Sequence, residues 1–68
     1  DYKTVLQEKL QIHGNVEIKY YITKESGPDH DKEFESKVEC NGKVLGKGKG
    51  KTKKESEMMA AKAAIENM

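Results

Sequence analysis

Hydrophobic and polar residues alternate along the chain with two different periods, and the change of period divides the sequence into elements. Leu6 and Leu10 lie four residues apart, which predicts an amphipathic helix over residues 1–13. Asp1 is predicted to cap its start and Gly14-Asn15 to end it. The side predicted to be buried is extended by Val5, Lys9, Ile12 and His13.

From Val16 the period is two, which is typical of half-buried strands. The first predicted strand, residues 16–23, has as its inward positions Val16, Ile18, Tyr20 and Ile22. Turn-forming residues at 26–31 predict a loop before the second strand. The inward positions of that strand are Phe34, Ser36, Val38 and Cys40. Asn41-Gly42 is a strong hairpin signal, so residues 43–47 should return antiparallel.

The last segment begins with a capping box, in which Thr52 and Glu55 would satisfy each other's backbone N–H groups. A stripe of small apolar residues follows and predicts a helix packed closely on a sheet, through Met58, Ala60, Ala61, Ala64, Ile65 and Met68. The fold class is therefore α+β: one domain over residues 1–68, with a three-stranded antiparallel sheet and both helices on one face. The other sheet face shows Glu, Lys and Thr.

Composition limits the classes of protein that fit this pattern. The 68 residues are 34% hydrophobic, which is enough for one thin core. No apolar run is long enough to predict a transmembrane helix. The single cysteine, Cys40, cannot form an internal disulfide, which favours a reducing, cytoplasmic location. Because the chain opens at Asp1 without an initiator methionine, we expect it to be a piece of a longer protein.

The net charge of +1 conceals one strongly basic segment. Residues 43–54 contain six lysines and no acid, whereas the other seven lysines share the remaining chain with all twelve acidic residues. A charge run is usually only a solvated surface. Here glycines alternate with the lysines and a helix start follows, so the amide groups and positive dipole end of that helix add to the lysines. This combination predicts a phosphate-binding site.

Two further polar features accompany the lysines. The first predicted helix carries a stripe of Thr4, Gln7, Glu8 and Gln11, which is either its solvated side or a surface for hydroxyl-bearing partners. The loop Gly27-Pro28-Asp29-His30 is either a simple turn or a contact loop. A helix face for hydroxyls, a loop and a lysine cluster are what double-stranded RNA requires, with its 2′-hydroxyls in the minor groove and phosphates along the major groove. The chain has only one Phe and three Tyr and no Trp, so recognition of single strands by stacking of their bases on aromatic side chains is disfavoured.

These motifs resemble the double-stranded RNA-binding domain family over essentially the whole chain. The resemblance is carried by residues 4–8, by 27–30 with Phe34 following, and by 48–57 leading into Ala60-Ala61. The opening residues are more narrowly similar to the C-terminal domain of bacterial ribonuclease III. Ser56 departs from the family's usual alanine, and Glu57 stands where some members have lysine.

The resemblance implies three sets of RNA contacts. The first helix would meet 2′-hydroxyls in one minor groove through Thr4, Gln7, Glu8 and Gln11. The loop would enter the next minor groove through Pro28 and His30, partly by backbone carbonyls. The start of the last helix would hold phosphates across the major groove through Lys53 and Lys54, with Lys51 and Thr52 nearby.

The resemblance also implies that this chain binds without cutting. Ribonuclease III cleaves with a separate domain whose carboxylates hold Mg²⁺ and which forms the homodimer, and no such acidic signature is present here. We therefore expect a monomeric, non-catalytic chain without metal or cofactor. It would present double-stranded RNA to a nuclease domain elsewhere in the parent protein, as in rRNA or mRNA precursor processing. The alternatives are a protein-interaction or dimerisation module of the same fold, and non-specific DNA binding through the lysines.

Overall fold

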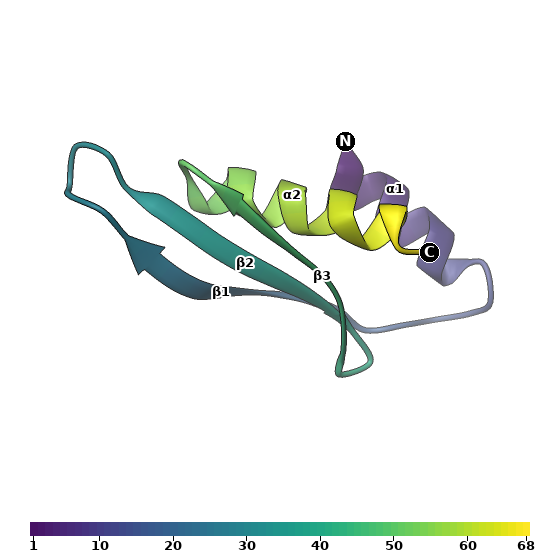
Figure 1. The fold of residues 1–68 in the computed structure, drawn as a ribbon. Coiled ribbons are helices and arrows are strands. Elements are labelled where there is room, and N and C mark those ends of the chain that lie inside the picture. The colour runs from purple at the N-terminus through teal and green to yellow at the C-terminus, as the bar shows by residue number, and fades with distance from the viewer.

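A computed structural model describes all residues, 1–68, and shows a helix, three strands and a second helix. These are α1 (Tyr2–Gln11), β1 (Ile18–Ser26), β2 (Glu33–Cys40), β3 (Lys43–Gly50) and α2 (Lys53–Glu66). The antiparallel strands lie in the order β1-β2-β3, and both helices lie on one side of the sheet (Figure 1). The predicted α+β fold is confirmed. Neither helix combines the length and apolar character needed to cross a membrane.

Helix α1 has the predicted caps but buries less than expected. The Asp1 carboxylate accepts from the backbone N–H of Lys3 at 2.9 Å, and the chain leaves the helix through Gly14 at φ +119°. Only Leu6 is fully buried, and Ile12 is 73% exposed. The prediction that the buried side extends further was wrong for Val5, Lys9, Ile12 and His13, which are exposed. The reason is that α1 packs chiefly against α2. Only a narrow stripe of the helix, formed by Lys3, Leu6 and Leu10, is shielded from solvent.

The strands follow the predicted alternation, with shifted ends. Strand β1 begins at Ile18, two residues later than predicted, and continues to Ser26. In β2 the inward positions Ser36 and Val38 are fully buried. The hairpin prediction at Asn41-Gly42 is confirmed, since both residues have positive φ, 51° and 84°. Asn41 also contacts the segment between α1 and β1, because its side-chain oxygen accepts a hydrogen bond from the backbone N–H of Glu17 at 2.9 Å.

Strand β3 is longer than predicted because the Gly/Lys stretch belongs to the sheet. Alternation turns the glycines toward α2, where a Cβ on Gly48 would lie 2.2 Å from the backbone nitrogen of Ala60. Gly46 and Gly50 meet α2 backbone atoms in the same way, at 2.6 Å. The intervening Lys47 and Lys49 are exposed and pair in register with β2 residues of the outer face. These glycines therefore serve helix packing and not anion binding.

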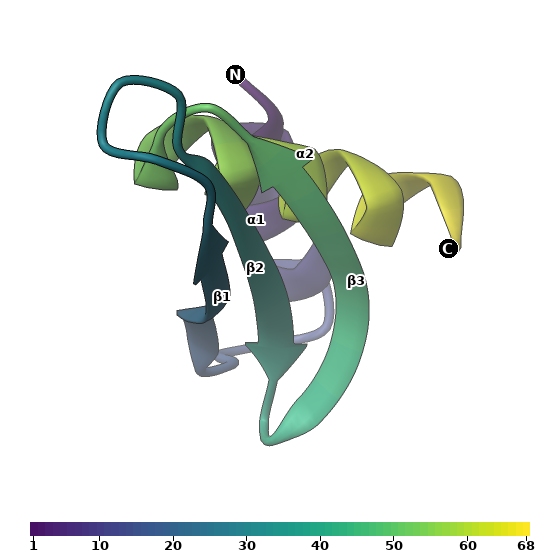
Figure 2. The same cartoon turned by 60° about the vertical axis from the view of Figure 1, so that its left-hand side comes forward.

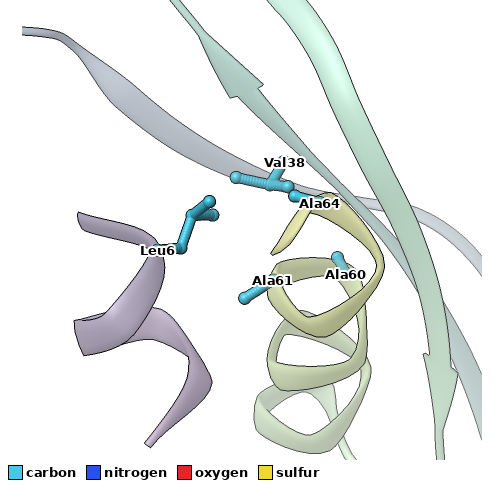
Figure 3. Packing of buried hydrophobic residues seen from close by; sticks show 5 residues of the cluster. All are labelled: Leu6, Val38, Ala60, Ala61 and Ala64. Carbon is cyan, nitrogen blue, oxygen red and sulfur yellow. The ribbon is translucent and has the colours of Figure 1, made fainter. Parts of the chain in front are cut away.

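The core is small and consists mostly of alanine. Leu6 from α1 and Val38 from β2 converge on three alanines of α2 (Figure 3), so that the fully buried cluster comprises Leu6, Val38, Ala60, Ala61 and Ala64. The predicted stripe is confirmed for its alanines, while Met58 and Ile65 are half-buried. Met68 was wrongly included, because the helix ends at Glu66 and Met68 is 63% exposed.

One polar pair lies within this apolar layer. The hydroxyls of Ser36 and Ser56 are 2.6 Å apart and both residues are fully buried. The Ser56 hydroxyl donates to the Lys53 carbonyl at 2.7 Å, so Ser36 must be the donor in the pair. The hydroxyl at position 56 thus links β2 to the first turn of α2.

We expect Ser56→Ala to lower the free energy of unfolding by about 1–3 kcal/mol, because it leaves the buried Ser36 hydroxyl without a partner. The double variant Ser36→Ala/Ser56→Ala should be more stable than Ser56→Ala alone, since it removes both hydroxyls together. Urea unfolding of the two single variants and the double variant checks this order. A double variant less stable than Ser56→Ala would show that Ser36 contributes through packing.

Candidate nucleic-acid interface

The start of α2 is capped, but not by the reciprocal arrangement predicted. The Thr52 hydroxyl accepts from the Glu55 N–H at 3.0 Å. The Glu55 carboxylate accepts from the N–H of Lys51 at 2.8 Å, one residue before the predicted donor. Thr52 is therefore the N-cap of α2. The N–H groups of Lys53 and Lys54, in the first turn, have no acceptor within the helix. This end of α2 provides the partial positive charge expected of an anion site.

The structure divides the lysine cluster into groups with different surroundings. Lys53 and Lys54 are exposed, and neither forms an ion pair. Lys51 is 3.0 Å from the Asp31 carboxylate, and the hydrogen bond and charge of Asp31 raise its pKa. Lys47 and Lys49 lie on the outer face of β3. The two lysines at the start of α2 are thus the free cations beside the helix end.

The β1–β2 loop is held in one conformation by contacts at its base. Gly27 has φ +89°, and a Cβ there would lie 2.5 Å from the Asp31 carbonyl oxygen, so only glycine fits. Lys32 forms a hydrogen-bonded ion pair with Glu25, whose pKa this contact lowers. The Pro28 carbonyl accepts from the Asp31 N–H at 2.9 Å, and is thus already engaged within the loop. His30 is exposed beside it.

The polar stripe of α1 lies in solvent as predicted, on Thr4, Gln7, Glu8 and Gln11. Two of these side chains also border a shallow groove of about 310 Å³ between α1 and β1. Gln7 and Gln11 line it together with Lys3 from α1 and Tyr20 from β1. The amide groups of the two glutamines beside this groove are suited to hydroxyl-bearing ligands, whereas the Lys3 ammonium is engaged by Glu57.

The three predicted regions follow one another along the length of the molecule, which measures 42 × 21 × 16 Å. The β1–β2 loop projects at one end next to the start of α2, and α1 lies toward the opposite end (Figures 1 and 2). The ion pair of Asp31 and Lys51 joins the loop to the start of α2. Along the molecule the loop comes first, the lysines next and the α1 face last. A-form RNA presents a minor groove, the phosphates along the major groove and the next minor groove in the same order.

A contact that the sequence pattern did not indicate joins α1, β1 and α2. The Lys3 ammonium forms an ion pair with Glu57 and lies 4.4 Å from the centroid of the Tyr20 ring. The Tyr20 hydroxyl is buried without a hydrogen-bond partner; this burial, and next the charge of Glu57, raise its pKa. Glu57 was notable in the sequence only as a departure from lysine, because nothing in the local spacing connects it with Lys3.

The raised pKa of Tyr20 predicts a loss of stability at high pH. Above the unfolded-state pKa of about 10, the folded chain keeps the Tyr20 proton that the unfolded chain releases, so the stabilisation present below pH 10 falls as the pH rises. Urea unfolding at pH 9 and 11 should show a smaller fall for Tyr20→Phe than for the unchanged chain. At pH 9, Tyr20→Phe should be at least as stable, because the hydroxyl has no partner. A less stable Tyr20→Phe would contradict this account.

Comparison with known proteins agrees with this geometry. The double-stranded RNA binding motif family matches residues 2–68, and the chain belongs to that family. It is 53% identical over its full length to a protein named ribonuclease 3 from Streptococcus thermophilus, and 50% identical to one from Limosilactobacillus reuteri. It covers 30% and 29% of these two proteins, so the chain spans about a third of the length of the curated relatives it matches.

These findings confirm the resemblance drawn from residues 4–8, 27–30 and 48–57. They establish a double-stranded RNA-binding domain related to ribonuclease 3. The assignment of individual side chains to grooves and phosphates stays a prediction.

Proposed function

We propose that the chain recognises double-stranded RNA by shape, with little dependence on base sequence. The observation that carries this proposal is the pair of exposed, unpaired lysines, Lys53 and Lys54, at a capped helix start that an ion pair joins to a projecting loop. The lysines and the amide groups of the helix end would bind phosphates on the two sides of the major groove. Lys51 would join them by exchanging Asp31 for a phosphate, and Thr52 would support them as the cap.

The two ends of the molecule would enter successive minor grooves. Pro28 and His30 are exposed in the loop, and the exposed face of α1 carries Thr4, Gln7, Glu8 and Gln11. Carboxylate and amide oxygens accept hydrogen bonds from 2′-hydroxyls, which DNA lacks. A duplex contacted at both ends and held by phosphates in between would be distinguished from DNA and from single strands.

For the whole protein, we propose a role in positioning double-stranded RNA for cleavage by a ribonuclease III domain, as in the processing of rRNA and mRNA precursors. The similarity to proteins named ribonuclease 3 supports this. In this proposal the Mg²⁺ and the homodimer contact belong to the nuclease domain, and the whole protein is a cytoplasmic enzyme.

Fluorescence anisotropy with a duplex of about 20 base pairs tests the binding function, since such domains span about 16 base pairs. The same sequence is compared as RNA duplex, DNA duplex and single-stranded RNA at two salt concentrations. We expect preference for duplex RNA, with affinity falling as salt rises. Equal binding to DNA would reduce the α1 stripe to a solvated surface. Binding to none of them would favour a protein-interaction module.

A further inference from the structure

We propose that the Lys3–Glu57 ion pair is a positioning contact that holds the hydroxyl-binding face of α1 at a set distance from the phosphate-binding lysines of α2. This inference rests on the proposed function and adds to it two residues that do not themselves touch RNA. We refer to Lys3, Tyr20 and Glu57 as the helix latch. The latch would make the preference for RNA over DNA depend on side chains that are not themselves RNA contacts.

The latch joins three elements in a partly desolvated place. Lys3 comes from α1, Tyr20 from β1 and Glu57 from α2, and the Lys3 ammonium contacts both the Glu57 carboxylate and the face of the Tyr20 ring. The Lys3 and Glu57 side chains are only 35% and 24% exposed. An ion pair with this much shielding is less screened by salt than a fully exposed one, and the ring adds a cation–π contact.

The position of the latch along each helix explains how it could affect both sets of proposed RNA contacts. On α1, Lys3 lies four residues before Gln7, so Gln7 occupies the same face one turn further along. On α2, Glu57 lies four residues after Lys53 and three after Lys54, again one turn away on the same side. The ion pair therefore connects the two helices one turn from each set of proposed RNA contacts. A change in the separation of the helices at the ion pair would therefore change the distance between the two sets of proposed RNA contacts.

The remaining attachment of α1 is slight. Leu6 is its only fully buried residue, and its side chain points toward Val38 beside the alanines of α2 (Figure 3). Leu10 is half-buried against the same core, and the Tyr2 ring centroid lies 5.9 Å from the Lys62 ammonium of α2. Leu6 and Leu10 hold the middle and the last turn of α1, so the position of its first turn relative to α2 depends on the contacts of Tyr2 and Lys3. Of these two residues, Lys3 provides the ion pair.

A simple charge effect makes a different prediction, which allows the two accounts to be separated. Glu57 lies close to the phosphate-binding lysines, so by charge alone Glu57→Gln would strengthen RNA and DNA binding together, and Lys3→Gln would weaken both. The charge-neutral double variant Lys3→Gln/Glu57→Gln would then bind like the unchanged chain. By the positioning account, both single variants and the double variant lower the ratio of RNA to DNA affinity.

The experiment measures affinity for matched RNA and DNA duplexes, with thermal melting to confirm that each variant is folded at the assay temperature. We expect Lys3→Gln/Glu57→Gln to lower the RNA-to-DNA affinity ratio by about tenfold, the effect of one or two lost hydrogen bonds, without changing the salt slope. Lys3→Arg, which keeps the ion pair and the ring contact, should retain the ratio. A double variant that melts below the assay temperature would leave the comparison of Lys3→Gln with Lys3→Arg to decide.

The outer face of the sheet offers a matched control. Lys37 and Glu39 are 3.1 Å apart with side chains 31% and 17% exposed, and Lys37 lies 5.3 Å from the Tyr21 ring centroid. Lys37→Gln/Glu39→Gln should therefore keep the ratio. An unchanged ratio in the latch double variant, with the unchanged chain still preferring RNA, would overturn the positioning account and leave the proposed function intact. Absence of any RNA preference in the unchanged chain would overturn both.

Discussion

Replacing Lys53 and Lys54 together by alanine is expected to lower the affinity for a duplex RNA by about 100-fold. Each lysine would lose a charge-assisted contact to a phosphate, and each such contact is worth about tenfold or more. The slope of log affinity against log salt should fall by roughly 1.4–1.8, because two phosphate contacts no longer release counterions. Anisotropy titrations over a series of salt concentrations measure both quantities. The variant should remain folded, since both side chains are exposed and unpaired.

The chain contains its own control for this experiment. Lys47 and Lys49 are also exposed and without ion pairs, but they lie on the outer face of β3. Lys47→Ala/Lys49→Ala removes the same net charge and should reduce affinity only slightly. If both double variants lose the same affinity, binding follows the total charge of the domain, and the assignment of phosphates to the start of α2 is wrong.

Gly48→Ala is expected to destabilise the domain severely without touching the proposed RNA contacts. The added Cβ would lie 2.2 Å from the Ala60 backbone nitrogen and 2.4 Å from the Met59 backbone carbon. Backbone atoms of a helix cannot turn aside as a side chain can, so α2 must separate from β3. We expect a loss of about 3 kcal/mol in the free energy of unfolding and a fall in Tm of roughly 12–24 °C, measured by circular dichroism.

Gly42→Ala tests whether this loss comes from packing. Gly42 has φ +84° and open space around its Cβ position, so alanine there would incur only backbone strain of about 1–2 kcal/mol. Gly48→Ala should therefore lower Tm by considerably more than Gly42→Ala does. Equal effects of the two substitutions would mean that the contact between β3 and α2 is looser than the structure indicates.

Local patterns were sufficient to predict the order of elements and the turns. The hairpin at Asn41-Gly42, the cap at Asp1 and the inward side of β2 depend on neighbouring residues only, and each is where the pattern placed it. The alanine stripe of α2 likewise predicted close helix packing, which Ala60 and Ala64 confirm. The exposed Thr4, Gln7, Glu8 and Gln11 could be placed on one helix face for the same reason.

The errors arose where an element's surroundings lie far away in sequence. Spacing alone could not show that α1 rests on α2, so Ile12 was wrongly expected to be buried. The Gly/Lys stretch suggested a single anion-binding segment, because nothing local indicates which side of β3 a helix will cover. Once α2 covers the glycines, strand alternation sends Lys47 and Lys49 to the opposite face.

The residues that could bind RNA were thus determined by the sequence, through the chemistry and periodicity of three short segments. The relative positions of these residues in space depend on contacts between residues far apart in sequence. These contacts are Asp31 with Lys51, Ser36 with Ser56 and Lys3 with Glu57. Such pairs bring together side chains from different elements, and no helical or strand period connects them. Only the packing of α2 against both the sheet and α1 decided which lysines are free to bind RNA and which are paired with acidic side chains.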